Sequence, residues 1–166
     1  MSMHRSKGLE FPIVFLADLG KSFNLNDVRS DVLFHKDLGV GLAIIDPDKR
    51  CRYDTFSHQV IKDRLKQDLL AEEMRILYVA MTRAREQLIL VGTSRDLAKA
   101  ALKWAGAVSQ GWALPSDVLV SAQSYLDWLG PALIRHRDGE ALRAAAGKTE
   151  EERAVTLLDD PSRWYV

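Results

Sequence analysis

The chain of 166 residues is 47% apolar and 28% charged, a composition typical of a globular protein with one buried core. Lysine plus arginine and aspartate plus glutamate both number 23, so the chain lacks the basic surplus of a free-standing nucleic-acid-binding domain, and any such contact is expected to be local or shared with other parts. The single cysteine, Cys51, excludes an internal disulfide and a cysteine-based metal site, and no apolar run is long enough to cross a membrane, so we expect a cytoplasmic protein without a bound metal.

A continuous apolar run, Phe-Pro-Ile-Val-Phe-Leu-Ala, occupies residues 11–17. Because apolar and polar residues do not alternate here, the run predicts a strand covered on both faces, as in a parallel sheet. Pro12 has no backbone N–H, so it is tolerated only near the start of this strand or at a sheet edge.

Residues from about 20 to 55 carry a mixed pattern, which we interpret as an insertion. Short strands are predicted near residues 32–35 and 41–45, and Asp46-Pro47-Asp48-Lys49 is typical of a turn. The insertion separates the first strand from a long helical segment.

Residues 56–85 carry an apolar stripe at helical spacing, formed by Ile61, Leu65, Leu69, Leu70, Met74, Leu77 and Met81. Because the segment is long for one helix, we expect a break near residues 70–72. A second buried strand is predicted at residues 88–91. The pattern Thr93-x-x-Asp96 then resembles a capping box, which would open a helix that runs to about Ala107.

The pattern weakens after Gly111. A short amphipathic helix is predicted at residues 121–129, and Gly130-Pro131 is expected to end it or to start another. Residues 139–153 favour a helix but lack an apolar stripe, which indicates an exposed or mobile segment. The order of elements predicts an α/β fold, with one domain over residues 1–110 and a mainly helical extension over residues 111–166.

Polar groups of several kinds gather in the loop before the first strand. Gly8 permits a positive φ or a close backbone approach there. Such a loop suits the binding of a phosphate together with a sugar hydroxyl, but a solvated loop is an equally good interpretation from the residues alone. The polar side chains are those of Ser2, His4, Arg5, Lys7 and Glu10.

Two arginines, Arg75 and Arg83, lie on the long predicted helix. A guanidinium is costly to bury without a partner, so each arginine should either pair with a nearby carboxylate or face an anionic ligand. Composition alone favours pairing, for which Glu72, Glu73 and Glu86 are the nearest carboxylates.

The segment Gly20-Lys21-Ser22 follows a strand and superficially suggests a phosphate loop. The full motif requires an earlier glycine at the position of Phe15, and no helical pattern follows Ser22. We therefore predict no nucleotide loop at this position.

Two stretches together resemble a known family. The stretch from Ser2 to Pro12 (SMHRSKGLEFP) resembles motif V of superfamily-one helicases of the UvrD, PcrA and RecB branch, and the stretch from Glu72 to Ala84 (EEMRILYVAMTRA) resembles motif VI. Further segments are similar to the AddA (RexA) family of helicase–nuclease subunits. These are KGLEFPIVF at residues 7–15, LGKSFN at 19–24, LGVG at 38–41 and SYLDWLGPAL at 124–133.

The resemblance implies a RecA-like sheet of the P-loop NTPase type, present here as a partial second motor domain. It implies that Arg75 reaches the γ-phosphate of ATP as a catalytic residue, and that Gly8 and Glu10 contact the nucleotide. It also implies nucleic-acid contacts from Ser2, His4 and Arg5. Coupling between the two motifs is implied for Lys7, Thr82 and Arg83.

The resemblance further implies an ATP-dependent 3′–5′ DNA helicase that repairs double-strand breaks with an AddB (RexB) partner. ATP would bind with Mg²⁺ held by a first motor domain of the same parent chain, so we expect this part to be an excised fragment and to be inactive alone. Two alternatives stay open. One is a UvrD-, PcrA- or RecB-like fragment, and the other is a non-catalytic DNA-binding or interaction module.

Overall fold

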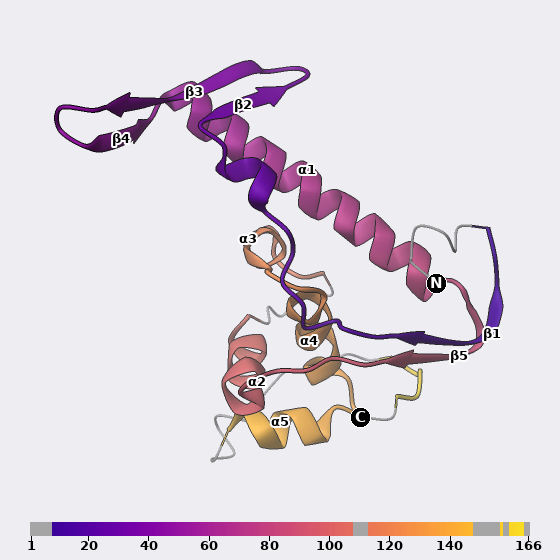
Figure 1. Ribbon diagram of the computed structural model, residues 1–166. Helices are drawn as coiled ribbons and strands as arrows, with labels where there is room; N and C mark the ends of the chain where they lie inside the picture. The colour runs from indigo at the N-terminus through magenta and orange to yellow at the C-terminus, as the bar shows by residue number, and fades with distance from the viewer. Residues whose placement is uncertain (1–7, 108–112, 148–156, 158–159, 165–166) are drawn as a thin grey trace. The chain divides into compact units, whose positions relative to one another are not determined.

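A computed structural model describes residues 8–107, 113–147, 157 and 160–164 (Figure 1). The chain forms two compact units, one made of Met1–Glu10 with Phe23–Arg83 and the other of Phe11–Ser22 with Ala84–Val166. The backbone therefore passes from one unit to the other after Glu10, after Ser22 and after Arg83.

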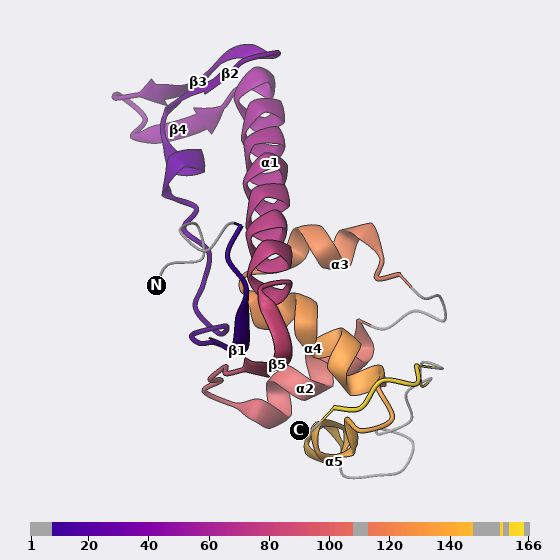
Figure 2. The ribbon, with the colours of Figure 1, turned by 90° about the vertical axis from the view of Figure 1, so that its right-hand side faces the viewer.

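The insertion forms an antiparallel sheet in the first unit, with strands β2 (Val32–His35), β3 (Gly39–Asp46) and β4 (Cys51–Asp54) in that order (Figures 1 and 2). The two predicted strands and the predicted turn are confirmed. The Asp46 carboxylate accepts hydrogen bonds from the backbone N–H groups of Asp48 and Lys49 at 3.1 and 3.0 Å, which fixes the turn. The sequence did not indicate β4, which is short and largely polar.

Helix α1 (Phe56–Met81) follows, and Thr55 caps its first turn by accepting from the His58 N–H. The helix runs unbroken for 26 residues, so the predicted break at residues 70–72 is wrong. Neither glycine nor proline interrupts the segment, and its residues are mostly good helix formers, so length alone was a poor reason for a break.

The first turn of α1 lies close against the sheet of the insertion. A Cβ at Gly41 would meet the His58 Cα at 2.7 Å, so only glycine permits this approach. His58 and Ile61 are fully buried beneath the sheet, and the His58 Nε2 lies 2.9 Å from the Ser30 carbonyl oxygen. The sheet and the beginning of α1 therefore form one packed layer.

The second unit contains a two-stranded parallel sheet, β1 (Phe11–Leu16) beside β5 (Ala84–Leu90). The parallel pairing confirms the expected α/β class. The register shifts between Phe11 and Ile13, around Pro12, which has no N–H to donate. The expected cover on both faces is not found, because the side chains of Ile13 and Phe15 are 50% and 66% exposed.

The helices of the second unit pack mainly on one another. They are α2 (Leu97–Gly106), α3 (Ser116–Ser121), α4 (Tyr125–Arg135) and α5 (Glu140–Ala146). The cap of α2 is Asp96, whose carboxylate accepts from the Lys99 N–H at 2.9 Å, so the expected capping role of Thr93 is wrong. Asp96 lies directly before the first helical residue, and a cap acts only from that position.

The single helix predicted at residues 121–129 is in fact two, because α3 ends at Ser121 and α4 begins at Tyr125. Gly130 and Pro131 neither end α4 nor start a new helix, since both lie inside it. A Cβ at Gly130 would collide with the Trp104 ring, so the glycine permits close packing of α4 on α2.

Helix α5 is shorter than the stretch predicted at residues 139–153, of which residues 148–153 lie outside the described part. It is not simply exposed, because Ala146 joins a core with Ala101, Trp104 and Ile134. Among the described residues, no helix combines the length and apolarity that a membrane span requires.

Candidate functional site

The carboxyl end of α1 is tied to the loop before β1 by Arg83. Its Nε donates to the Val79 carbonyl at 2.9 Å, and its Nη1 donates to the Leu9 carbonyl at 3.2 Å. Its Nη2 lies 3.2 Å from the Thr82 hydroxyl oxygen. One planar guanidinium thus joins two of the predicted site segments, which are far apart in the sequence.

Thr82 closes the same helix end. Its hydroxyl lies 3.0 Å from the Tyr78 carbonyl oxygen and 3.1 Å from that of Val79, and its backbone N–H also points to Tyr78. These donors satisfy carbonyl groups that the end of a helix leaves without partners. Thr82 therefore shapes the helix end, and its hydroxyl is engaged with backbone.

The loop before β1 turns at Gly8, whose φ is +84°. This value lies in the left-handed region, and the expected use of a glycine with positive φ is confirmed. Glu10 follows at the exposed end of the loop. Ser2, His4, Arg5 and Lys7 lie outside the residues that the structure describes.

Arg75 forms an ion pair with Glu72 on the open side of α1. The Arg75 Nη1 lies 2.8 Å from the Glu72 carboxylate, and the two side chains are 73% and 59% exposed. An exposed pair of this kind stabilises a fold by only about 0–1 kcal/mol. The pairing interpretation is thus observed, and the exposure leaves the guanidinium accessible to a ligand.

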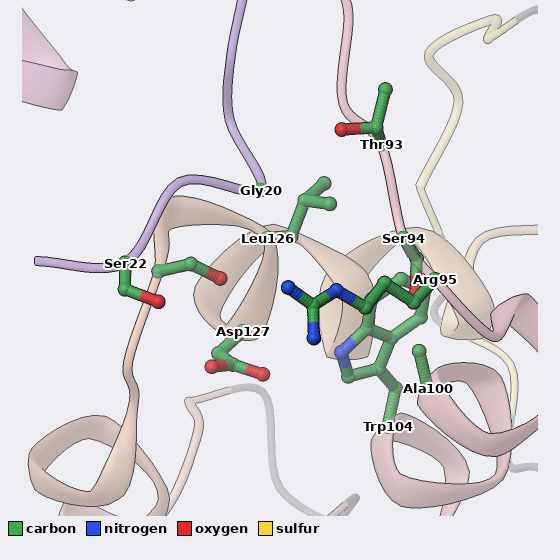
Figure 3. Close-up of a pocket in the computed structure, with 10 residues that line it drawn as sticks. Gly20, Ser22, Thr93, Ser94, Arg95, Ala100, Trp104, Leu126 and Asp127 are labelled. Carbon is green, nitrogen blue, oxygen red and sulfur yellow. The ribbon is translucent and has the colours of Figure 1, made fainter.

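A second polar place lies in the other unit, at a position where the sequence indicated no site. A cavity of about 540 Å³ opens at the carboxyl ends of β1 and β5 (Figure 3). Polar residues that directly follow both strands line it, which is the signal that could have indicated it. The segment Gly20-Lys21-Ser22 contributes to this wall, and no helix begins at Ser22, as predicted.

Asp127 is the carboxylate of this cavity. Burial acts to raise its pKa, but hydrogen bonds from Lys103 and from the Gln123 backbone N–H outweigh burial and hold the pKa below its usual value. The Lys103 Nζ and the Gln123 N–H both lie 2.9 Å from its oxygens. Asp127 is therefore ionised and locally neutralised at physiological pH.

Comparison with known proteins gives a consistent result. A protein-family model described as UvrD-like helicase C-terminal domain matches residues 1–95. Three similar proteins, all named as ATP-dependent helicase/nuclease subunits of one type, come from Pelotomaculum thermopropionicum, Heliobacterium modesticaldum and Bacillus anthracis. They are 53%, 48% and 52% identical over 100%, 99% and 86% of this chain. The matched region spans only 12–13% of the length of these relatives.

Proposed function

Because the chain belongs to the family of UvrD-like helicase C-terminal domains, we propose that it supplies the nucleotide-closing and DNA-contacting part of a second motor domain. The parent would be an ATP-dependent helicase–nuclease of the AddA type. The observation that carries the proposal is the Arg83 bridge, which joins the end of α1 to the Gly8–Glu10 loop.

The finer fold assignment belongs to the same proposal. β1 and β5 would be two adjacent strands of a RecA-like sheet, and the exposed apolar side chains of Ile13 and Phe15 would be covered by elements of the parent chain. Residues 1–110 would form the motor part, and residues 111–166 would lead toward a nuclease domain. The parent would act on DNA in the cytoplasm, in the repair of double-strand breaks, with a partner of the AddB type.

Arg75 would act on ATP hydrolysis. A water molecule attacks the γ-phosphorus, the bond to the ADP oxygen breaks, and negative charge spreads over the equatorial phosphate oxygens. The Arg75 guanidinium would leave Glu72 and stabilise that charge, because its fork matches a phosphate and its ion pair with Glu72 is weak. Glu10 would accept a hydrogen bond from a ribose hydroxyl, and Mg²⁺ would be held by the first motor domain.

Coupling to DNA would run through Arg83. The same helix that carries Arg75 ends at Met81, where Arg83 holds the Leu9 carbonyl. A shift of α1 on closing over ATP would therefore pull the loop that contains Ser2, His4 and Arg5. Those side chains suit phosphate contacts that do not read sequence.

The test compares variants in the full-length protein that carries this chain. Arg75→Gln should lower single-strand-stimulated ATP hydrolysis roughly a thousandfold while nucleotide still binds. Glu72→Gln breaks the same ion pair and should leave hydrolysis nearly unchanged. Arg64→Gln is the matched control, since Arg64 is also exposed on α1 and pairs with Asp68 at 3.3 Å. Equal, small effects of Arg75→Gln and Glu72→Gln would show that Arg75 serves only as an ion-pair partner.

A further inference from the structure

The cavity at the carboxyl ends of β1 and β5 is held in shape by backbone contacts. The Leu19 N–H donates to the Val91 carbonyl at 3.2 Å, and the Leu126 N–H donates to the Leu19 carbonyl at 3.0 Å. A Cβ at Gly20 would collide with the Thr93 carbonyl, so the two strand exits lie in close contact. A cavity of this size, at this end of parallel strands, is where α/β proteins bind ligands. Its lining residues are Gly20, Ser22, Thr93, Ser94, Arg95, Ala100, Trp104, Ser124, Leu126 and Asp127.

Trp104 brings an unused donor to this cavity. Its side chain is only 5% exposed, and its Nε1 is buried without a hydrogen-bond partner. Figure 3 shows the indole edge turned toward the space between Arg95 and Asp127. The indole makes the smallest contribution to the lowered pKa of Asp127, but its N–H forms no hydrogen bond of normal geometry with that carboxylate. An indole N–H only donates, and buried donors normally have a partner, so the missing group is an acceptor.

Arg95 brings an unused cation. Its guanidinium points into the same space (Figure 3), and no hydrogen bond or ion pair is found for it within the described part of the chain. The planar fork of an arginine matches two oxygens of a phosphate. Hydroxyl groups of Ser22, Thr93 and Ser94 lie around it.

The charge balance of the cavity favours an anion. The only carboxylate among its lining residues is Asp127, and Lys103 neutralises it at 2.9 Å. With that pair cancelled, Arg95 is the remaining charge. The ligand should therefore carry negative charge and several acceptor oxygens.

We propose that this cavity binds a phosphate group between the Arg95 guanidinium and the Trp104 indole N–H. The phosphate could belong to a phosphodiester of a DNA strand or to a free phosphate. The DNA source rests on the proposed function, whereas the phosphate site itself does not. The site differs from a phosphate loop, because side-chain donors from α2 and its preceding loop would hold the ligand.

The test uses the ¹⁵N-labelled chain and follows the Trp104 indole N–H by NMR. That signal is identified by its loss in Trp104→Phe, which keeps an aromatic ring but removes the donor. A short oligothymidylate and inorganic phosphate are titrated separately, into the wild type and into Arg95→Gln. Lys99→Gln is the control, since Lys99 is exposed on the same helix but does not line the cavity. Circular dichroism checks that each variant keeps its fold.

We expect oligothymidylate to shift the Trp104 signal. Arg95→Gln should weaken oligothymidylate binding about tenfold and lower the slope of log affinity against log salt by about one, while Lys99→Gln does neither. A shift with inorganic phosphate alone supports the phosphate site and assigns it to a free phosphate. Oligothymidylate binding that leaves the Trp104 signal and the Arg95→Gln affinity unchanged overturns the site while the proposed function stands. A chain that binds phosphate at this cavity but no oligothymidylate keeps the site and contradicts the proposed DNA role of the chain.

Discussion

The Arg83 guanidinium donates to the Leu9 carbonyl at 3.2 Å, across more than seventy residues of sequence. Its Nε simultaneously donates to the Val79 carbonyl inside α1. One half-buried side chain therefore fixes the distance between the end of a long helix and the loop at the other candidate segment. This link is a mechanical connection that neither segment has alone.

Replacement of Arg83 by alanine should loosen this connection. The Leu9 and Val79 carbonyls would lose their donors, so we expect the chain to be destabilised by about 1–3 kcal/mol, measured by urea unfolding. Arg83→Lys keeps the charge near the helix end, but a single ammonium cannot span both carbonyls, so it should rescue stability only in part. An alanine variant as stable as the wild type would show that the bridge contributes nothing.

The same Arg83→Ala substitution in the full-length protein should separate ATP hydrolysis from DNA. We expect basal hydrolysis to persist while its stimulation by single-stranded DNA falls at least about tenfold, a loss of roughly 1.4 kcal/mol in coupling. The measurement is the ratio of hydrolysis rates with and without oligothymidylate. A ratio that stays at the wild-type value would contradict the proposed route of coupling.

The isolated chain should not hydrolyse ATP. The proposed function places the Mg²⁺ ligands and the phosphate loop in another domain, so Arg75 alone has no bound phosphate to act on. The check is phosphate release by the purified chain with ATP, Mg²⁺ and single-stranded DNA. Magnesium-dependent hydrolysis at the rate of a full-length relative would contradict this expectation.

Packing between α2 and α4 depends on a glycine. Gly130→Ala would drive a methyl group into the Trp104 ring, and we expect it to destabilise the chain by about 1–3 kcal/mol through overpacking. Gly106→Ala is the matched control, because a Cβ there meets nothing within 4 Å. The control should be neutral or stabilising by up to about 1 kcal/mol. Thermal unfolding of the two variants compares them directly, and equal effects would contradict the tight contact.

The ionised Asp127 carboxylate should make stability depend on acid pH. Its pKa is lowered in the folded chain, so its contribution is fully present above the unfolded value of 3.8 and is lost as the pH falls through the folded pKa. Asp127→Asn should therefore lower the melting temperature at neutral pH, with a difference that shrinks below about pH 4. Asp63→Asn, at an exposed position on α1, should show no such trend. A constant difference across the pH range would show that hydrogen-bond geometry, rather than charge, is lost.

Local patterns predicted the elements that local physics determines. The apolar run from Phe11 forms a parallel strand, and the Asp46 turn forms because its carboxylate bonds to neighbouring N–H groups. Gly8 adopts the positive φ that its position in a turn suggested. Each of these features depends on residues that are close in the sequence.

Features that depend on distant contacts could not be predicted in this way. Helix α4 continues through Gly130 and Pro131 because that surface packs on Trp104, which lies on another helix. The cavity brings together residues 20–22, 93–95 and 124–127, and no single segment indicates it. Likewise, Arg83 and Leu9 are adjacent only in the fold, and the two candidate segments had suggested their coupling through resemblance alone.

The central claim is that Arg75 stabilises the transition state of ATP hydrolysis. The most direct measurement is the affinity of the full-length protein for ADP with aluminium fluoride, compared with its affinity for a non-hydrolysable ATP analogue, in wild type and Arg75→Ala. We predict that the substitution weakens binding of the transition-state analogue roughly a thousandfold and binding of the ATP analogue by less than about tenfold. Equal losses for both ligands, or no loss for either, would contradict the claim and leave Arg75 as the partner of Glu72 alone.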